Sequence, residues 1–379
     1  MASPPLGVYV HFPFCAAICP YCDFNVYKMR DLDADAWADA YCAELRHAAA
    51  LRPQGPVESL FFGGGTPSLM PVALVAAIIE AIDRLWGFAA NAEITLEANP
   101  EGLDAPILQD FAACGITRLS LGVQSLDDAA LAFLGRHHSA AQAMSVFALA
   151  QNSFPASSLD LIYARPGQTL AAWEKELARA LSLAPQHMSL YQLTFEPETA
   201  FGLQMRQGRL QPPEEELAAE LFEHSRAACA QAGLPAYEVS NHARAGAECR
   251  HNVSNWQGGD YAGIGPGAHG RLSVDGVRHA SYALPVPKDW LQAVAAKGHG
   301  WQSFEPLDDA ARQAEALLLG LRLTQGIAFD RLSAMGLLLD GARLADMQAA
   351  GFIVGDATHL AATAQGCLVL DRLVAELLL

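Results

Sequence analysis

The first two-thirds of the chain alternates short apolar runs with longer stretches in which apolar residues recur at helical spacing. Short runs rich in β-branched and aromatic residues predict strands, and the longer stretches predict helices. Strand followed by helix, about six times over, is typical of a parallel sheet with right-handed crossovers. The predicted strands are Val8–His11, Ser59–Phe62, Glu93–Glu97, Arg118–Val123, Leu159–Tyr163 and Met188–Leu193, and the predicted helices are Ala34–Leu51, Pro71–Trp86, Asp104–Cys114, Ala140–Asn152 and Leu170–Leu183.

These six units occupy about 200 residues, whereas a closed eight-unit barrel typically takes about 250. We therefore predict an α/β fold whose core is a partial (β/α)6, TIM-like barrel. A doubly wound open sheet has the same periodicity and stays an open alternative.

The pattern changes after about Gln211–Pro213. A helical stretch (Glu214–Ala232) and a short run (Ala236–Val239) lead to a glycine-rich segment (Gln257–Gly270), and an α-rich unit with two short strands follows from Leu307. Helices followed by two strands predict a smaller α+β, winged-helix-like domain. We expect a core domain over residues 1–235, a connecting segment over 236–306 and the C-terminal domain over 307–379.

Composition narrows the function classes. The chain of 379 residues is 52% hydrophobic and carries a net charge of −17, which disfavours binding to nucleic acid or to an anionic membrane surface. Winged-helix units often bind DNA, but this one has few basic side chains, so we expect a packing or lid role. No targeting signal and no membrane-spanning stretch is recognisable, and we expect a cytoplasmic protein.

Three of the eight cysteines fall within eight residues, as Cys15, Cys19 and Cys22. Soft thiolates at this spacing select an iron–sulfur cluster or zinc. Three ligands leave one cluster iron without a protein ligand, which is what a reactive site needs. A zinc site would need a fourth ligand such as His11 or Asp23, and three incidental thiols are the remaining alternative.

Polar and glycine residues follow the predicted strands at the ends where barrel chemistry gathers. Gly63–Gly65 follow the second strand, Asn99 the third, Gln124 the fourth and Pro166–Gly167 the fifth. Glycines let the backbone approach a ligand closely. The sequence therefore predicts a site at the carboxyl ends of the strands, together with the cysteines.

The cysteine loop and the turn Gly63-Gly-Gly-Thr-Pro67 resemble the radical S-adenosylmethionine (SAM) superfamily. The resemblance implies a [4Fe-4S] cluster on Cys15, Cys19 and Cys22 whose open iron binds SAM. Further blocks, such as Glu93–Pro100, Arg118–Ser125 and Leu134–His138, resemble the oxygen-independent coproporphyrinogen III oxidases (HemN) and their relatives, the heme chaperones (HemW). By that likeness the residues at the SAM site are Tyr9, Tyr21, Phe24, Gly64, Gly65, Thr66, Glu97, Gln124, Arg136 and Asp160.

Two features favour the chaperone branch. The oxidases carry another cysteine two residues after the third, where this chain has Phe24, and His251-Asn252 begins a motif that resembles the His-Asn-x-x-Tyr-Trp motif of the chaperones. The resemblance implies His251 as heme ligand, with Cys249 and His269 as further candidates.

The likeness implies heme and heme-accepting proteins as partners, and a homodimer as one possible assembly. The alternatives are a coproporphyrinogen III oxidase and a radical SAM enzyme with another substrate.

Two departures stand out. Asn255 replaces the tyrosine of the heme-chaperone motif, and Ala164-Arg165 replaces the Gly-Leu of a Gly-Leu-Pro-Gly turn. We expect the second change to put a bulky cation beside the SAM pocket.

Overall fold

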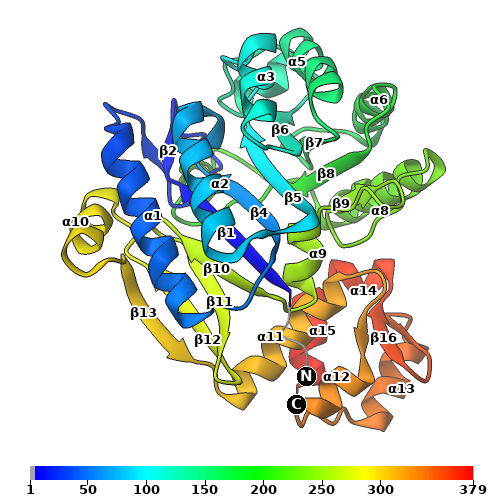
Figure 1. Ribbon diagram of the computed structural model, residues 1–379. Helices are drawn as coiled ribbons and strands as arrows, with labels where there is room; N and C mark the ends of the chain where they lie inside the picture. Colours follow the sequence, from blue (N-terminus) through cyan, green and yellow to red (C-terminus); the bar gives the residue numbers. More distant parts are fainter. Residues whose placement is uncertain (1–4, 379) are drawn as a thin grey trace.

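The six predicted strands lie side by side and parallel in the computed structural model, which describes residues 5–378. Helices connect them and cover the outside of the sheet (Figure 1), so the predicted partial (β/α)6 barrel is confirmed. The strands are β1 (Leu6–Phe12), β4 (Val57–Gly64), β5 (Phe88–Ala98), β6 (Arg118–Gln124), β7 (Ala156–Tyr163) and β8 (His187–Gln192). The connecting helices are α1 (Ala34–Leu51), α2 (Val72–Trp86), α3 (Ala105–Ala113), α4 (Asp128–Phe133), α5 (Ala140–Ser153) and α6 (Leu170–Leu181), and α7 (Ala200–Arg206) and α8 (Glu215–Gln231) follow β8.

The two faces of each strand meet different surroundings, because successive residues point to opposite sides. Along β1, Val8, Val10 and Phe12 are fully buried in the main hydrophobic core. Tyr9 and His11 point to the other face, which is the inside of the barrel. The barrel interior is therefore free to carry polar chemistry while the opposite face supplies hydrophobic stability.

Residues 236–306 build both edges of the sheet. β9 (Asn241–Ala243) pairs antiparallel with β8, and β10 (Asp260–Ile264) pairs parallel with β1. Antiparallel strands continue the second edge, so that the sheet has eleven strands in the order β13-β12-β11-β10-β1-β4-β5-β6-β7-β8-β9. The remaining elements of this segment are α9 (Arg250–Trp256), β11 (His269–Val274), β12 (Val277–Ala283), α10 (Pro287–Lys297) and β13 (Trp301–Pro306).

Glu44 on α1 fastens that added edge to the barrel. Its carboxylate accepts hydrogen bonds from the backbone N–H groups of Gly265 and Gly300, both at 2.7 Å, and from Trp290 Nε1 at 3.1 Å. Burial raises the pKa of Glu44 to about 7. One fully buried carboxyl group thus joins three segments far apart in the sequence.

The C-terminal domain has a hydrophobic core of its own. It packs against the barrel at the lower right of Figure 1, where Arg322 pairs with Glu238 at 3.0 Å and the Thr324 N–H donates to Tyr237 O. Its elements are α11 (Asp309–Arg322), β14 (Ile327–Ala328), α12 (Phe329–Ala334), α13 (Gly341–Ala349), β15 (Ile353–Gly355), β16 (His359–Ala362), α14 (Ala364–Leu368) and α15 (Leu370–Leu377), with the strands in the antiparallel order β14-β16-β15.

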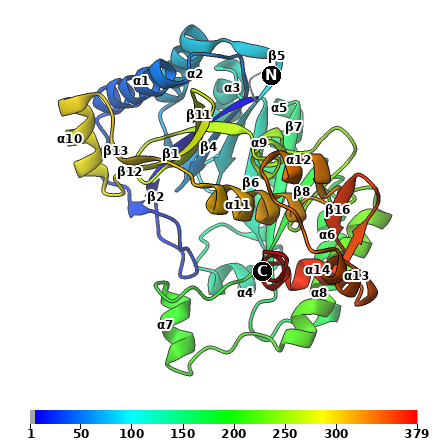
Figure 2. The same cartoon turned by 90° about the horizontal axis from the view of Figure 1, so that it is seen from below.

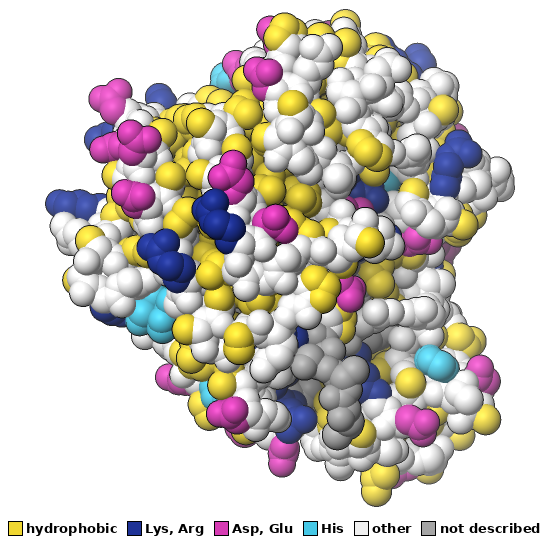
Figure 3. Space-filling view, in the orientation of Figure 1, with side chains coloured by type: hydrophobic (Ala, Val, Ile, Leu, Met, Phe, Trp, Pro, Cys, Tyr) yellow, Lys and Arg dark blue, Asp and Glu magenta, His cyan; other side chains and the backbone are white. Residues whose placement is uncertain are grey.

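The surface gives no sign of a large basic region on the face seen in Figure 3, where Lys and Arg are interspersed with Asp and Glu. Within residues 5–378, no helix combines the length and the apolar character needed to cross a membrane.

Candidate functional site

The cysteine loop leaves the barrel directly after β1. Short strands β2 (Phe14–Cys15) and β3 (Tyr27–Lys28) pair and close the loop, with the Met29 N–H donating to Cys15 O at 2.8 Å. Inside the loop the Cys22 N–H donates to Cys19 O at 3.1 Å. Figure 2 shows this loop reaching toward α4 and α7, and the Phe201 N–H of α7 donates to Pro20 O at 2.8 Å. The loop is therefore held at both its base and its tip.

All three cysteines of the loop line one pocket of about 260 Å³ at the carboxyl ends of the barrel strands. Within residues 5–378, no three His, Cys, Asp or Glu side chains are grouped as the ligands of a metal ion. The thiols instead face a shared space that other strand ends also border. Predicted residues on the same pocket are Tyr21, Phe24, Gly64, Gly65, Thr66, Glu97, Gln124, Arg136 and Asp160.

The glycine turn after β4 packs against the strand that carries Cys15. The Gly65 N–H donates to Phe12 O at 2.7 Å, and the Thr66 N–H donates to Phe14 O at 2.8 Å. A Cβ on Gly65 would lie 2.5 Å from Phe14 O, and Gly64 has a φ of +106°. The backbone conformation therefore requires a glycine at position 64, and packing requires one at position 65. Both requirements hold whether or not a ligand approaches the turn.

Two carboxyl groups, Glu97 on β5 and Asp160 on β7, lie close enough inside the barrel to interact electrostatically. Burial, with the nearby Asp160 second, raises the pKa of Glu97 to about 8, and burial raises the pKa of Asp160 to about 6. Glu97 Oε2 accepts from the Gly64 N–H at 3.2 Å, and Asp160 Oδ2 accepts from Ser120 Oγ at 2.9 Å. Asp160 Oδ1 and Gln124 Oε1 are buried without a hydrogen-bond partner among residues 5–378. The pocket thus offers free acceptors to a ligand that brings donors or positive charge.

Arg136 is the cation of the pocket. Its guanidinium lies 3.5 Å from Cys19 Sγ and donates to Gly122 O at 3.0 Å and to Asn99 Oδ1. Burial raises the pKa of the Cys22 thiol to about 11 and also raises that of Cys15. Positive charge beside the loop is the chemistry that a cluster with thiolate ligands, or a carboxylate, requires.

Tyr9 and His11 differ in placement from the other predicted residues. Tyr9 does not line the pocket but lies deeper in the barrel, where its hydroxyl is 3.0 Å from His11 Nδ1. His11 Nε2 is also occupied, 2.9 Å from Asn25 O, so neither ring nitrogen is free for a metal. Phe24 is 64% exposed and stands at the mouth of the pocket.

Several lining residues were missed by the sequence reasoning. Ser120, Tyr191 and Thr194 border the pocket, and Asn99 was noted only for its position after a strand. The strands alternate polar and apolar residues, as in His187-Met-Ser-Leu-Tyr191. Parallel strands buried on both faces normally read as continuous apolar runs. This alternation was the available signal that the barrel interior is polar.

His251 lies at the opposite end of the barrel, on α9. Its imidazole stacks on Phe61 at 4.8 Å between centroids and on Tyr9 at 6.1 Å, and its Nε2 is 3.1 Å from Asn255 Nδ2. Burial lowers the pKa of His251 to about 4, so the ring is neutral at pH 7. The neutral form is the one that binds metals, but this ring is enclosed.

Contacts on both sides keep α9 in place. The Arg250 N–H donates to Glu93 Oε1 of the barrel at 2.8 Å, and the guanidinium of Arg322 lies 4.5 Å from the ring centroid of Trp256. The C-terminal domain therefore covers the outer side of the helix whose inner side carries His251.

Arg165 corrects one expectation. Its side chain is buried and pairs with Glu176 of α6, and it does not line the pocket of the cysteines. The positive charge predicted beside the pocket therefore lies outside the pocket lining. The carboxylate that α6 places there neutralises it.

The fold and the three-thiol loop define a radical SAM protein. Residues 9–180 match the Radical SAM superfamily, and residues 307–369 match the HemN C-terminal domain. The chain is similar over 99% of its length to coproporphyrinogen III oxidase (HemN) from Escherichia coli, with a TM-score of 0.82, 23% identity and 90% of that chain covered, a likeness that shows the fold.

Similarity in sequence narrows the family. The chain is 37% identical over its whole length to heme chaperone HemW of Mycobacterium tuberculosis, with 96% of that protein covered, and 35% identical to heme chaperone HemW of Bacillus subtilis, with 96% of each covered. It is 39% identical to radical S-adenosyl methionine domain-containing protein 1, mitochondrial, of Bos taurus, over 99% of this chain and 88% of that protein. The chain belongs to the HemW family, in the HemN/HemW branch of the radical SAM superfamily.

Membership of that superfamily implies SAM and a [4Fe-4S] cluster as cofactors. The residues present fit both groups. Three thiols supply soft ligands for iron, and the pocket beside them holds the unpartnered acceptors of Gln124 and Asp160.

Proposed function

We propose that this protein binds heme and delivers it to acceptor proteins, while the cluster and SAM serve a regulatory or assembly role. The observation that carries the proposal is Phe24, which occupies the position of the further cysteine in the oxidases and is exposed at the mouth of the pocket. Likeness to the heme chaperones over nearly the whole chain supports it.

In this proposal Cys15, Cys19 and Cys22 hold the cluster. A cluster held by these three thiolates would supply an iron with an open coordination position for SAM, and an electron. Arg136 donates to the SAM carboxylate and balances thiolate charge, since it already lies beside Cys19.

The remaining pocket residues orient SAM. Gly64–Thr66 approach the methionyl end. Glu97 and Asp160 hold ribose hydroxyls or the ammonium group, and Gln124 uses its free carbonyl oxygen. Tyr21 and Phe24 cover the open side. Tyr9 does not line the pocket. In this proposal it supports the base of the pocket from below, through the contact of its hydroxyl with His11.

Replacing Cys15, Cys19 and Cys22 by Ala tests the cluster assignment. After anaerobic reconstitution, iron per chain should fall from about four to near zero, and the visible absorption of the cluster should disappear. Iron retained near four per chain contradicts the assignment.

We propose His251 as the heme ligand, in a state in which α9 has moved away from the barrel. Its neutral imidazole and its unpartnered Nδ1 support this role, whereas its enclosure means that heme cannot reach it with α9 in place. The sequence offers two further candidates. His269 is exposed, and Cys249 is a buried thiol next to α9.

Heme titration of the reconstituted protein tests this function. One heme per chain should bind with a shift of the Soret band, and His251→Ala should abolish the shift while His269→Ala keeps it. Loss of the shift only in His269→Ala assigns the ligand to His269. Light scattering on the same samples shows whether the heme-loaded protein is a dimer.

The main alternative is the oxidase, favoured by the fold that this chain shares with coproporphyrinogen III oxidase. Anaerobic incubation with coproporphyrinogen III, SAM and a reductant distinguishes the two. A divinyl product contradicts the chaperone proposal. SAM cleavage with neither product nor heme binding indicates a radical SAM enzyme with another substrate.

A further inference from the structure

Gln124 enters the pocket from a strained part of the backbone. It ends β6 with a φ of +67°, a left-handed conformation that costs a residue with a Cβ free energy. The pairing of β6 with β7 is irregular between Gly122 and Gln124. A Cβ on Gly122 would lie 2.8 Å from Gln124 Nε2, so the amide lies over this glycine. The position of the Gln124 amide therefore depends on whatever holds the turn that follows it.

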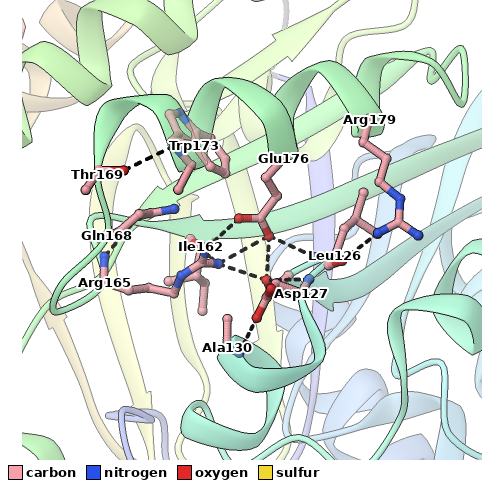
Figure 4. A network of polar contacts seen from close by, with 12 residues as sticks. Leu126, Asp127, Ala130, Ile162, Arg165, Gln168, Thr169, Trp173, Glu176 and Arg179 are labelled. Atoms are coloured by element: carbon pink, nitrogen blue, oxygen red, sulfur yellow. Dashed lines mark hydrogen bonds and ion pairs between the residues drawn. The ribbon is translucent and has the colours of Figure 1, made fainter.

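A carboxylate from another element holds that turn. Glu176 Oε1 on α6 accepts from the Leu126 N–H at 2.8 Å (Figure 4), and it also accepts from Ser125 Oγ. The Asp127 N–H donates to Ser125 Oγ at 3.1 Å, and Arg179 donates to Leu126 O at 2.8 Å. Beyond the end of β6 the backbone N–H no longer has a neighbouring strand as its acceptor. The carboxylate of Glu176 accepts its hydrogen bond instead.

Arg165 joins this turn to the neighbouring strand. Its guanidinium pairs with Glu176 Oε2, donates to Ser125 Oγ at 3.0 Å, and donates to Ile162 O of β7 at 3.0 Å. Figure 4 shows the guanidinium of Arg165 next to Glu176 and Ile162. Ile162 lines the pocket, as Gln124 does. Arg165 therefore connects the backbones from which two pocket residues project.

The chemistry explains why an arginine stands here. Both side chains of the ion pair are 8% exposed, and a buried charge is costly unless it is paired and hydrogen-bonded. The planar guanidinium reaches a carboxylate, a hydroxyl and a carbonyl at once, which the ammonium of lysine cannot do in the same geometry. A buried pair is weak evidence for stability but suits the specification of one local conformation.

We propose that Arg165 and Glu176 are positioning residues for the SAM pocket, since their buried ion pair fixes the turn that directs the Gln124 amide into it. The inference rests on the proposed role of Gln124 toward SAM. It adds a functional reason for Arg165, the residue that departs from the family's usual turn.

A double-mutant cycle tests it on reconstituted full-length protein. We expect Arg165→Lys, which keeps the charge and loses the fork, to weaken SAM binding about tenfold in equilibrium dialysis. Hydrogen exchange of the amides in residues 122–127 should accelerate in the same variant. In a Gln124→Ala background the same replacement should change SAM affinity by less than about twofold, because the group it positions is gone.

Arg271→Lys is the matched control, since Arg271 pairs with Glu315 at 2.7 Å on β11 and α11, away from the pocket. It should leave SAM affinity unchanged. Iron content like that of the wild type shows that each variant keeps the cysteine loop, and Glu176→Gln provides a second disruption if Arg165→Lys does not fold.

Wild-type affinity in Arg165→Lys, or a tenfold loss that persists without the Gln124 amide, overturns the proposal. If Gln124→Ala alone leaves SAM affinity unchanged, the role of Gln124 fails and the positioning role fails with it. The heme titration tests the proposed heme-binding function and does not depend on these three results for SAM affinity.

Discussion

Gly65 sits where β4 meets the strand that carries Cys15, so adding a single methyl group there tests how the cysteine loop is held. In Gly65→Ala the new Cβ would lie 2.5 Å from Phe14 O and 2.9 Å from Phe12 O. Both are backbone atoms, which cannot rotate away as a side-chain end can. Reaching an ordinary 3.4 Å contact with Phe14 O requires a displacement of about 0.9 Å (3.4 minus 2.5).

The expected cost follows from overpacking. Forcing a methyl group into a well-packed site typically costs about 1–3 kcal/mol, which corresponds to a decrease in Tm of roughly 1–4 °C for a chain of 379 residues. Because the displaced strand continues into Cys15, the variant should also lose cluster iron. Anaerobic reconstitution followed by iron analysis and visible absorption measures this, and differential scanning calorimetry measures Tm.

Gly341→Ala is the control. A Cβ there meets nothing within 4 Å, and the residue begins α13, where alanine favours the helix. It should keep full iron content and an equal or higher Tm. Wild-type iron content and Tm in Gly65→Ala would refute the reasoning that this glycine is required by the cysteine strand.

Further predictions concern stability and α9. The pKa of Glu44 is raised to about 7, so the folded state binds more protons than the unfolded state and the free energy of unfolding should fall as pH rises from about 4.5 to 7; Glu44→Gln should flatten this slope in denaturant titrations. Ala184 is exposed with a φ of +52°, and Ala184→Gly should stabilise by about 0.5–1 kcal/mol, whereas Ala178→Gly inside α6 should destabilise by about 1 kcal/mol. Arg322→Met removes the cation from Trp256, worth roughly 0.5–2 kcal/mol, and also the partner of the buried Glu238; it should speed both hydrogen exchange of α9 and heme binding, and unchanged exchange contradicts a covering role for the C-terminal domain.

Much of the fold was predictable because it rests on local periodicity. The six strands and their helices follow from apolar spacing, and each predicted strand overlaps an observed one within a few residues. The pairing of β10 with β1 was not predictable, since β10 is a short glycine-containing strand some 250 residues away in sequence. Pairing between distant segments depends on which edges remain free once the barrel has formed.

The candidate site, like the fold, was predictable only where it depends on residues close together in the sequence. The spacing of the cysteines already implies three thiolates around one centre, and the structure places all three on one pocket. The enclosure of His251 by Tyr9 and Phe61 depends on α9 entering the barrel from the other end. No local pattern around His251 contains that information.

What the sequence by itself determined is therefore the chemistry that lies close together along the chain: the cysteine loop, the glycine turn and the alternation of strands and helices. Only the tertiary structure decided which distant groups meet. Arg165 looked like a charge beside the pocket, yet α6 brings Glu176 to it and turns it into a support behind Gln124. The physical reason is that the free energy of a buried charge depends on its partners, and those partners are set by the packing of elements far apart in the sequence.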